Sequence, residues 1–447
     1  MAELTRRTFL GSVAMAAAAT QLHGASEAGK DVKTDAGAKA SAPPSTQGAK
    51  LRVGVVGVGG RGFNNLQDVM KVESAQVTAL CDVDVESLVH AARVVPDAKV
   101  FVDFRDMLKL AEVDAVLVAT ADHTHAVITA AALRAGKHVY CEKPLCHTIR
   151  EVRAIVELAD QTKLVTQTGI QMHATENYRR VVETIQSGAI GKVHDVHIWH
   201  NRTRRSFSPE LAAVPATLNY DLWIGPAKMR PFRRGYHPYS WRHWWDFGGA
   251  QIGDQSSHFL DVVFWSLGLT HPSRIKAQGT EPPRDEMVCN HLTAQFQFEA
   301  KGNQPAVTLH WYDNPAKPAE HSQWKLDDKL VSEAVMFVGD KGMLCTNYEM
   351  HQLLPEEKFK NFKAPAKSIP KSMGHHREWV KACLANDPKL AGAPFEYGAR
   401  LNEISLLGII AYRTGKEIEW DGEAGKVLNV PEAEKYLGYE FREGWSL

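Results

Sequence analysis

The chain has 447 residues, and its 52 lysines and arginines are balanced by 52 aspartates and glutamates, so its formal net charge at pH 7 is zero. This balance argues against a nucleic-acid-binding protein or one that binds a charged membrane surface. The hydrophobic content of 44% is ordinary for a globular protein. The length is too great for one ordinary core and predicts two domains.

The N-terminus resembles an export signal. Arg6 and Arg7 precede an apolar run, Phe9–Ala19, which is about half of the roughly 20 residues needed to span a bilayer. The pattern Thr-Arg-Arg-x-Phe-Leu resembles the twin-arginine signal, whose pathway exports folded proteins. We therefore expect a signal over residues 1–28 that directs the chain to the periplasm, followed by a polar linker over residues 29–50. A basic N-terminus with no targeting role is the alternative.

A glycine-rich turn follows the first predicted strand. Residues 51–56 form a short apolar, β-branched run, as in a parallel strand buried on both faces. The next six residues, Gly-Val-Gly-Gly-Arg-Gly, fit the Gly-x-Gly-x-x-Gly pattern of a dinucleotide site between a strand and a helix. The three glycines of that pattern allow a tight turn, close approach of a pyrophosphate, and close packing of helix on strand. The pyrophosphate would lie at the positive end of the helix. The residues expected to contact it are Gly57, Gly59, Gly60, Arg61 and Gly62.

The following strands agree with this interpretation. A second strand ends at Asp82, whose carboxylate can accept hydrogen bonds from the adenosine ribose and would repel a 2′-phosphate, which favours NAD over NADP. A third strand ends at Thr120, a helix is expected over residues 127–136, and a fourth strand ends at the Glu-Lys-Pro of residues 142–144. This order predicts an α/β Rossmann domain over residues 51–170, with its ligand-binding loops at one edge of the sheet.

Further side chains at that edge are expected to belong to the cofactor site. They come from the loops that follow the third and fourth strands. His123 and His125 are expected to shape the cofactor loop rather than to bind a metal, and no metal site is predicted. The residues of this set are Thr120, His123, His125 and Glu142.

Three motifs in this order, GVGGRG, ATADHTHA and CEKPL, resemble the Gfo/Idh/MocA oxidoreductases, and Glu-Lys-Pro is the most specific among them. The resemblance continues through SGAIGKVHDVHIWH and GDQSSHFLD to the C-terminal GWSL, so it spans essentially all of residues 51–447. It implies a Rossmann domain that binds NAD and a second domain with an open sheet. It also implies an enzyme that acts on sugars, inositols or related polyols.

The second half of the chain alternates apolar and polar residues, which is typical of an antiparallel sheet covered on one face. Such segments lie at residues 192–200, 291–300, 306–313 and 332–347, and the last contains a hairpin turn at Asp340-Lys341-Gly342. We expect an α+β substrate domain over residues 171–447 with a large open antiparallel sheet. Helices from about residue 375 and over about 396–414 would pack back onto the body of the protein.

Acid–base chemistry is indicated by the segment GDQSSHFLD, residues 253–261. On a helix, Asp254, His258 and Asp261 share one face. An aspartate one turn from a histidine can orient the ring, and histidine can titrate near neutral pH. The residues alone leave open a capping role for Asp254 and an ordinary core histidine. The resemblance implies that Asp254 and His258 bind substrate and transfer protons, whereas Asp261 is expected to be structural.

Lys143 is the third catalytic candidate. A lysine at the end of a buried strand is costly unless it has a partner or a function, and here it could hydrogen-bond the hydroxyl being oxidised; a surface lysine is the alternative. Substrate contacts are expected from an aromatic stretch that could either stack on a sugar ring or form core. These residues are Tyr236, His237, Tyr239 and Trp241.

The predicted signal and cofactor together bear on turnover. An exported enzyme has no maintained pool of NAD, so it would have to retain its cofactor and regenerate it in place. It could oxidise one sugar and reduce another, or oxidise a sugar at C3, eliminate the C1 substituent, add water and return the hydride. Some relatives are glycosidases of the second kind. A plain sugar or polyol dehydrogenase and a noncatalytic sugar-binding protein are the alternatives. The expected partners are a carbohydrate and further copies of the chain, with no nucleic acid and no membrane after signal cleavage.

Overall fold

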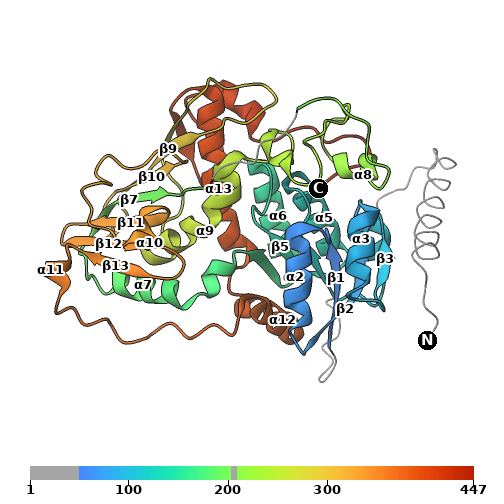
Figure 1. The fold of residues 1–447 in the computed structure, drawn as a ribbon, viewed down its shortest axis with the longest axis horizontal. Helices are drawn as coiled ribbons and strands as arrows, with labels where there is room; N and C mark the ends of the chain where they lie inside the picture. Colours follow the sequence, from blue (N-terminus) through green and yellow to red (C-terminus); the bar gives the residue numbers. More distant parts are fainter. Residues whose placement is uncertain (1–49, 203–208) are drawn as a thin grey trace.

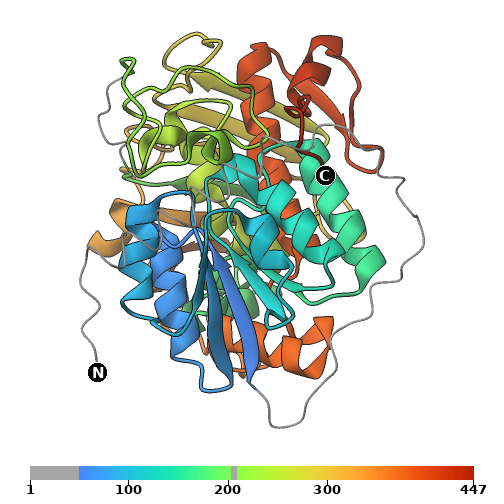
Figure 2. The same ribbon diagram turned by 90° about the vertical axis from the view of Figure 1, so that its right-hand side faces the viewer.

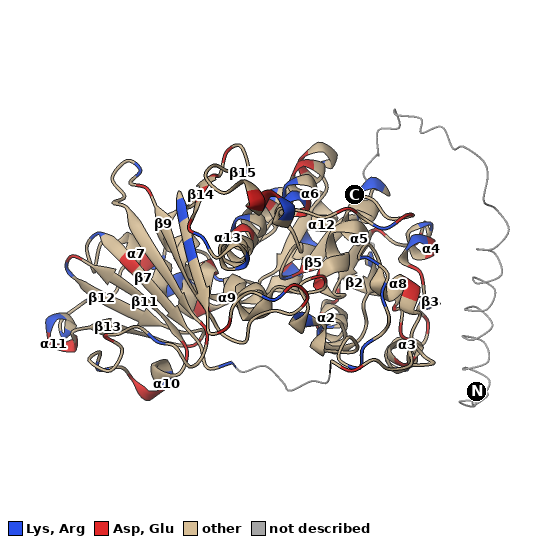
Figure 3. Cartoon of the chain, turned by 90° about the horizontal axis from the view of Figure 1, so that it is seen from above, with Lys and Arg blue, Asp and Glu red and all other residues tan. Residues whose placement is uncertain are grey.

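The computed structural model describes residues 50–202 and 209–447. The predicted signal and residues 29–49 of the predicted linker lie outside the described residues. Two β-sheets stand side by side with helices between them (Figure 1). Charged residues of both signs are distributed over both halves, in agreement with the balanced composition (Figure 3). Among the described helices, none is long and apolar enough to cross a membrane.

The first domain is a parallel six-stranded sheet of order β3-β2-β1-β4-β5-β6. Its helices lie on both sides of the sheet (Figure 2), which explains why β1 and β4 are almost wholly apolar and buried. The predicted Rossmann domain is therefore confirmed. The strands are β1 (Leu51–Val56), β2 (Ala75–Cys81), β3 (Lys99–Phe101), β4 (Ala115–Val118), β5 (His138–Glu142) and β6 (Thr166–Gly169). The helices are α2 (Gly60–Met70), α3 (Val85–Ala92), α4 (Phe104–Leu108), α5 (Asp122–Arg134) and α6 (Ile149–Thr162).

One predicted boundary in this domain is wrong. The helix expected over residues 127–136 begins at Asp122, directly after Ala121. Its first turn is polar and therefore gives no apolar periodicity, although Asp122, His123 and His125 are all buried. These three side chains consequently lie on a rigid helix at the carboxyl end of β4 and not on a loop.

The second sheet has nine strands in the order β13-β12-β11-β7-β10-β9-β8-β14-β15. It was predicted to be antiparallel, but β7 and β10 pair in parallel, so the sheet is mixed. The two strands are separated by a long excursion that includes helix α9, and this crossover lets them run in the same direction. The predicted hairpin between β11 and β12 is present. The strands are β7 (Val193–Trp199), β8 (Arg274–Gly279), β9 (Leu292–Phe298), β10 (Val307–Tyr312), β11 (Ala334–Gly339), β12 (Gly342–Thr346), β13 (His351–Leu354), β14 (Ile418–Asp421) and β15 (Lys426–Val427).

Two long helices, α9 and α13, lie between the sheets and contact each other (Figure 1). Helix α13 also contacts α6 of the first domain, and Trp379 of α12 belongs to the same apolar core as Val53 and Val55 of β1. The C-terminal helices thus pack back onto the first domain as predicted. The α-helices of this half are α7 (Glu176–Gln186), α8 (Tyr220–Ile224), α9 (Ala250–Leu267), α10 (Asp328–Val331), α11 (Glu356–Phe359), α12 (His375–Ala385) and α13 (Phe395–Thr414). Short 3₁₀ helices are η1 (Gln171–Ala174), η2 (Ser240–His243), η3 (Pro388–Leu390) and η4 (Pro431–Tyr436).

Candidate active site

The glycine-rich turn lies at the switch point of the parallel sheet, where β1 is flanked by β2 and β4. Gly57 has a φ of +82°, and a Cβ atom there would lie 2.6 Å from the carbonyl oxygen of Ala119. A Cβ atom at Gly62 would lie 1.8 Å from the carbonyl oxygen of Gly57. Both positions therefore require glycine. Gly59 precedes the first turn of α2, and no side chain caps that helix end, which leaves it open to an anion.

A cavity of about 460 Å³ opens in front of this turn. Its wall joins the ends of β1, β2 and β4 to the segment that follows α8, so it crosses the carboxyl edge of the sheet where a dinucleotide binds in doubly wound folds. The predicted cofactor and substrate residues that line it are Gly57, Gly59, Gly60, Arg61, Asp82, Thr120, His237, Tyr239 and Trp241. Its size, the uncapped helix and the required glycines fit an NAD molecule.

Asp82 lies in the wall where the adenosine ribose is expected. Its Oδ2 accepts a hydrogen bond from the backbone N–H of Val58 at 2.8 Å, and its Oδ1 accepts one from the N–H of Asp84 at 2.9 Å. Burial raises the pKa of Asp82, although these two bonds oppose the rise. The carboxylate is thus fixed in orientation, and each oxygen keeps a second lone pair for a ribose hydroxyl.

The three predicted catalytic residues meet at the junction of the two domains. Lys143 follows β5, and its Nζ donates to Asp254 on α9, with 2.8 Å to Oδ1 and 2.5 Å to the backbone oxygen. The two side chains are only 12% and 13% exposed. Burial opposes ionisation of Asp254, but Lys143 and Arg242 outweigh it and hold the pKa of this carboxyl well below its usual range. Lys143 and Asp254 therefore form a charged pair.

His258 lies one turn further along α9. Asp254, which was expected to orient its ring, is hydrogen-bonded to Lys143 and Gln255 instead. The Nδ1 atom of His258 is buried and, within the described part of the chain, has no hydrogen-bond partner. Burial and the positive charge of Lys143 lower the pKa of His258 to about 3. His258 is therefore neutral at physiological pH.

The predicted structural role of Asp261 agrees with its surroundings. It is fully buried, and its Oδ1 is 2.8 Å from Nδ1 of His173 and accepts a hydrogen bond from the hydroxyl of Tyr397. This aspartate ties α9 to η1 and α13.

The aromatic segment contributes to the site differently from what was predicted. Tyr236 is fully buried among Trp223, Trp244 and Phe247, so it belongs to the core and is not a substrate contact. The Nε2 atom of His237 lies 2.8 Å from Oδ2 of Asp84. This contact places His237 beside the ribose end of the cavity, where Asp82 lies.

Three predicted cofactor contacts lie behind the cavity wall. His125 is buried, with Nδ1 2.8 Å from the Pro144 oxygen and Nε2 3.1 Å from the Thr120 oxygen, and Nε2 of His123 is 3.0 Å from the oxygen of Trp223. The Oε1 atom of Glu142 accepts hydrogen bonds from side chains that include Asn65, Arg61 and Gln171. All three shape the loops and are placed too deeply to contact the dinucleotide directly.

Two site residues were not predicted from the sequence. Arg242 lines the cavity, with its Nε 3.4 Å from Oδ1 of Asp254 and its guanidinium carbon 4.0 Å from a ring centre of Trp241. Asp122 is buried, and its pKa is raised to about 7 because burial and Asp254 outweigh the attraction of Arg242 and Lys143. Two signals in the sequence could have indicated them. Arg242 lies inside an aromatic run, and Asp122 is an acidic residue shortly after the end of a strand.

Two models of one oxidoreductase family match the chain. The NAD-binding Rossmann domain matches residues 51–170, and the C-terminal alpha/beta domain matches residues 188–304, which together exceed half of the sequence. The chain belongs to the Gfo/Idh/MocA oxidoreductase family. Its first domain is accordingly an NAD-binding domain, as the glycine turn and Asp82 predicted.

Similar proteins include inositol 2-dehydrogenase of Burkholderia multivorans, which is 38% identical over 154 residues. That alignment covers 34% of this chain and 45% of the relative, so the chain matches about half the length of such curated relatives. The WlbA dehydrogenase of Bordetella pertussis, solved with NADH and UDP-GlcNAcA, has a TM-score of 0.60 and 19% identity over 83% of this chain and 99% of that one. Scyllo-inositol dehydrogenase of Lactobacillus casei, solved with NAD(H) and scyllo-inositol, has a TM-score of 0.55 and 20% identity over 83% and 99%. These structures share the fold.

Proposed function

We propose that this oxidoreductase uses NAD to oxidise a hydroxyl-bearing carbon of a sugar or polyol. The proposal is carried by the convergence of Lys143, Asp254 and His258 beside the dinucleotide cavity. Arg242 lines that cavity and contacts Asp254, so it connects the three residues to the cofactor site. A protein that only bound sugar would not require a buried cation and a neutral histidine at this point. The inositol dehydrogenases among its relatives support the same substrate class.

Lys143 is suited to hold the substrate hydroxyl. Two of its three ammonium hydrogens are engaged by Asp254, and the third can donate to the substrate oxygen. As that oxygen loses its proton, the adjacent positive charge stabilises the developing negative charge in a site with little water. Asp254 is thus a positioning residue for Lys143.

His258 is suited to accept the hydroxyl proton. Its low pKa means that the neutral form is present at physiological pH, and it lies one turn along α9 from Asp254, the partner of Lys143. A histidine with a low pKa is a weak base, so proton transfer depends on the acidification that Lys143 provides. The glycine turn and Asp82 would hold NAD, which would supply the hydride acceptor for the substrate carbon and, in a redox-neutral cycle, the hydride donor.

We propose further that the cofactor is retained and that the protein works in the periplasm. The support is the twin-arginine pattern at residues 5–10, combined with an NAD-binding domain. A protein exported in folded form could carry its NAD with it. Acid extraction of the purified protein should release near-stoichiometric NAD or NADH. Protein that is empty, and turns over only with excess added NAD, would contradict retention.

In the redox-neutral form of this proposal, the reaction is cleavage of a glycosidic bond. A ketone at C3 acidifies the hydrogen at C2, its removal expels the C1 substituent, water adds, and reduction restores the C3 hydroxyl. The net change is glycoside and water to sugar and alcohol. The plain dehydrogenase is the second candidate, favoured by the names of the relatives.

An aryl glycoside, its 3-deoxy analogue and heavy water distinguish these reactions. The glycosidase predicts that the 3-deoxy compound is inert and that the product takes up deuterium at C2. Cleavage of the 3-deoxy compound at a normal rate would exclude the redox route. A 3-keto product with stoichiometric NADH and no cleavage would establish the dehydrogenase, and binding without either product would establish a noncatalytic protein.

A further inference from the structure

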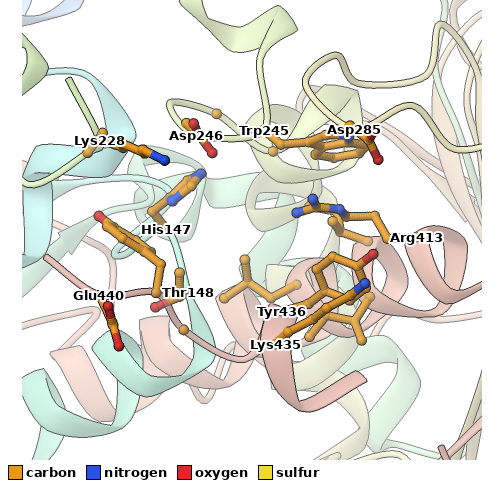
Figure 4. A pocket seen from close by; sticks show the side chains of 18 of the residues that line it. His147, Thr148, Lys228, Trp245, Asp246, Asp285, Arg413, Lys435, Tyr436 and Glu440 are labelled. Carbon is orange, nitrogen blue, oxygen red and sulfur yellow. The ribbon is translucent and has the colours of Figure 1, made fainter. Parts of the chain in front are cut away.

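A second cavity, of about 450 Å³, is lined in part by residues from the segments next to Lys143 and Asp254. It shares no lining residue with the dinucleotide cavity. His147, four residues after Lys143, forms one wall, and Gly249, directly before α9, forms another. Figure 4 shows His147 and Lys228 on one side of this cavity and Trp245, Arg413 and Tyr436 on the other. Its apolar side is formed by Leu406, Ile409 and Ile410 of α13.

The charged groups around this cavity are not fully paired. Of its four cationic side chains, Arg230 forms an ion pair with Asp246. Within the described part of the chain, no carboxylate lies within ion-pair distance of the other three, Lys228, Arg413 and Lys435. Two further carboxylates, from Asp285 and Glu440, also line the cavity, so an incoming ligand meets cations and hydrogen-bond acceptors together.

Arg413 is the most constrained of these cations. Its guanidinium carbon lies 5.0 Å from a ring centre of Trp245 and 4.2 Å from that of Tyr436. The guanidinium extends from α13 toward the side of the cavity on which His147 and Lys228 lie (Figure 4). Burial lowers the pKa of Arg413, although Tyr436 and Asp285 oppose the decrease. A guanidinium held at its faces presents its N–H edge, the geometry that matches a carboxylate.

His147 supplies a group for the remainder of such a ligand. Its Nδ1 atom is buried and, among the described residues, has no hydrogen-bond partner. Burial lowers the pKa of His147 to about 4, so the ring is neutral. The ring also belongs to the wall of a cavity large enough for a small organic molecule.

We propose that this cavity binds a small hydroxylated carboxylate, such as a sugar acid. The carboxylate would contact Arg413 and Lys228, and hydroxyl groups would contact His147, Asp285 and Glu440. The carboxylates of Asp285 and Glu440 in the wall favour a monoanion over a multiply charged phosphate, which they would repel more strongly. Because His147 and Gly249 adjoin the segments that carry Lys143 and Asp254, occupation of this site should also change turnover at the active site.

Calorimetric titration of the NAD-bound protein with sodium D-glucuronate, D-glucose and inorganic phosphate tests this proposal. We expect saturable binding of glucuronate alone. Arg413→Gln should weaken it about ten- to a hundredfold, and Lys228→Gln about threefold because that lysine is exposed. Arg274→Gln, which removes an exposed arginine paired with Glu419 on the second sheet, should leave binding unchanged.

The location of the bound anion is tested with Lys143→Ala. Binding that persists in this variant supports the second cavity, whereas its loss would place the anion at the active site and overturn the proposal. Equal affinity in wild type, Arg413→Gln and Lys228→Gln would also overturn it, as would glucuronate binding that is absent or no tighter than phosphate binding. Lys228 lies on the surface, so its variant remains informative if Arg413→Gln fails to fold.

Discussion

Asp254→Asn removes one negative charge from a site that holds two cations. The Oδ1 atom of Asp254 lies 2.8 Å from Nζ of Lys143 and 3.4 Å from Nε of Arg242. The lysine and aspartate side chains are 12% and 13% exposed, and the arginine side chain is 25% exposed. Water therefore cannot replace the carboxylate, and breaking a buried pair of this kind typically costs about 3–5 kcal/mol. Loss of the lysine's position should reduce kcat by about 10²-fold.

The assays are thermal unfolding of the NAD-bound protein, NAD affinity, and kcat for NADH formation. In Asp254→Asn, kcat should fall while NAD affinity is kept, because no carboxylate then holds Nζ of Lys143 in place. Asp261→Asn is the matched control. It also removes a buried carboxylate from α9, but one that contacts His173 and Tyr397. It should lower stability with a much smaller effect on kcat.

The positioning role of Asp254 is refuted if Asp254→Asn keeps its kcat within about threefold of wild type. It is also refuted if Asp261→Asn loses kcat to the same extent, because the effect would then be a general consequence of weakening α9.

Four other predictions concern His258, Asp82, the glycine-rich turn and Asp122. Because the pKa of His258 is lowered to about 3, its loss of the neutral form should not limit kcat/KM between pH 8 and 5; an acid limb near 6.5 that persists in Asp122→Asn would contradict this. Asp82→Asn keeps one acceptor oxygen for the backbone but loses the charge, so the ratio of NAD to NADP affinity should fall, and an unchanged ratio would remove Asp82 from the ribose contact. Gly59→Ala should fold normally and weaken NAD binding about tenfold, whereas Gly62→Ala should destabilise the fold because its Cβ atom would overlap a carbonyl oxygen; comparison of their melting and NAD titration curves decides this. The pKa of Asp122 rises from 3.8 to about 7 on folding, so the folded chain holds a proton that the unfolded chain has released, and stability falls as pH rises through this window. Asp122→Asn should therefore be more stable than wild type at pH 8 but not at pH 4, and an equal difference in unfolding free energy at the two pH values would contradict the assignment.

The first domain was predictable because its signals are local. Gly57 directly follows β1 and has a positive φ, and at both Gly57 and Gly62 a Cβ atom would overlap neighbouring backbone. The start of α5 was missed because its polar residues, beginning with Asp122, are buried by tertiary packing that no periodicity reports. The mixed character of the second sheet was missed because strand direction depends on how a long excursion returns, which β-alternation does not encode.

The sequence predicted which residues form the catalytic group but not which of them contact each other. Sequence spacing placed Asp254 and His258 on one helix face, yet the partner of Asp254 is Lys143, 111 residues away in the chain. Arg242 was overlooked because its role depends on the return of the aromatic segment to α9. Tyr236 was misassigned because core aromatic residues and ligand-facing aromatic residues have the same composition, and only burial separates them.

The most direct test of the central proposal is a single-turnover measurement on protein that retains its cofactor. A panel of sugars and polyols would be added to the NAD-loaded protein while the absorbance of NADH is recorded. The account predicts that at least one compound reduces the bound cofactor, that deuterium on the reacting carbon slows the reduction, and that Lys143→Ala and His258→Ala bind NAD normally but lose about 10²–10⁴-fold in rate. Reduction at wild-type rates in either variant, or panel members that bind without any reduction, would contradict it.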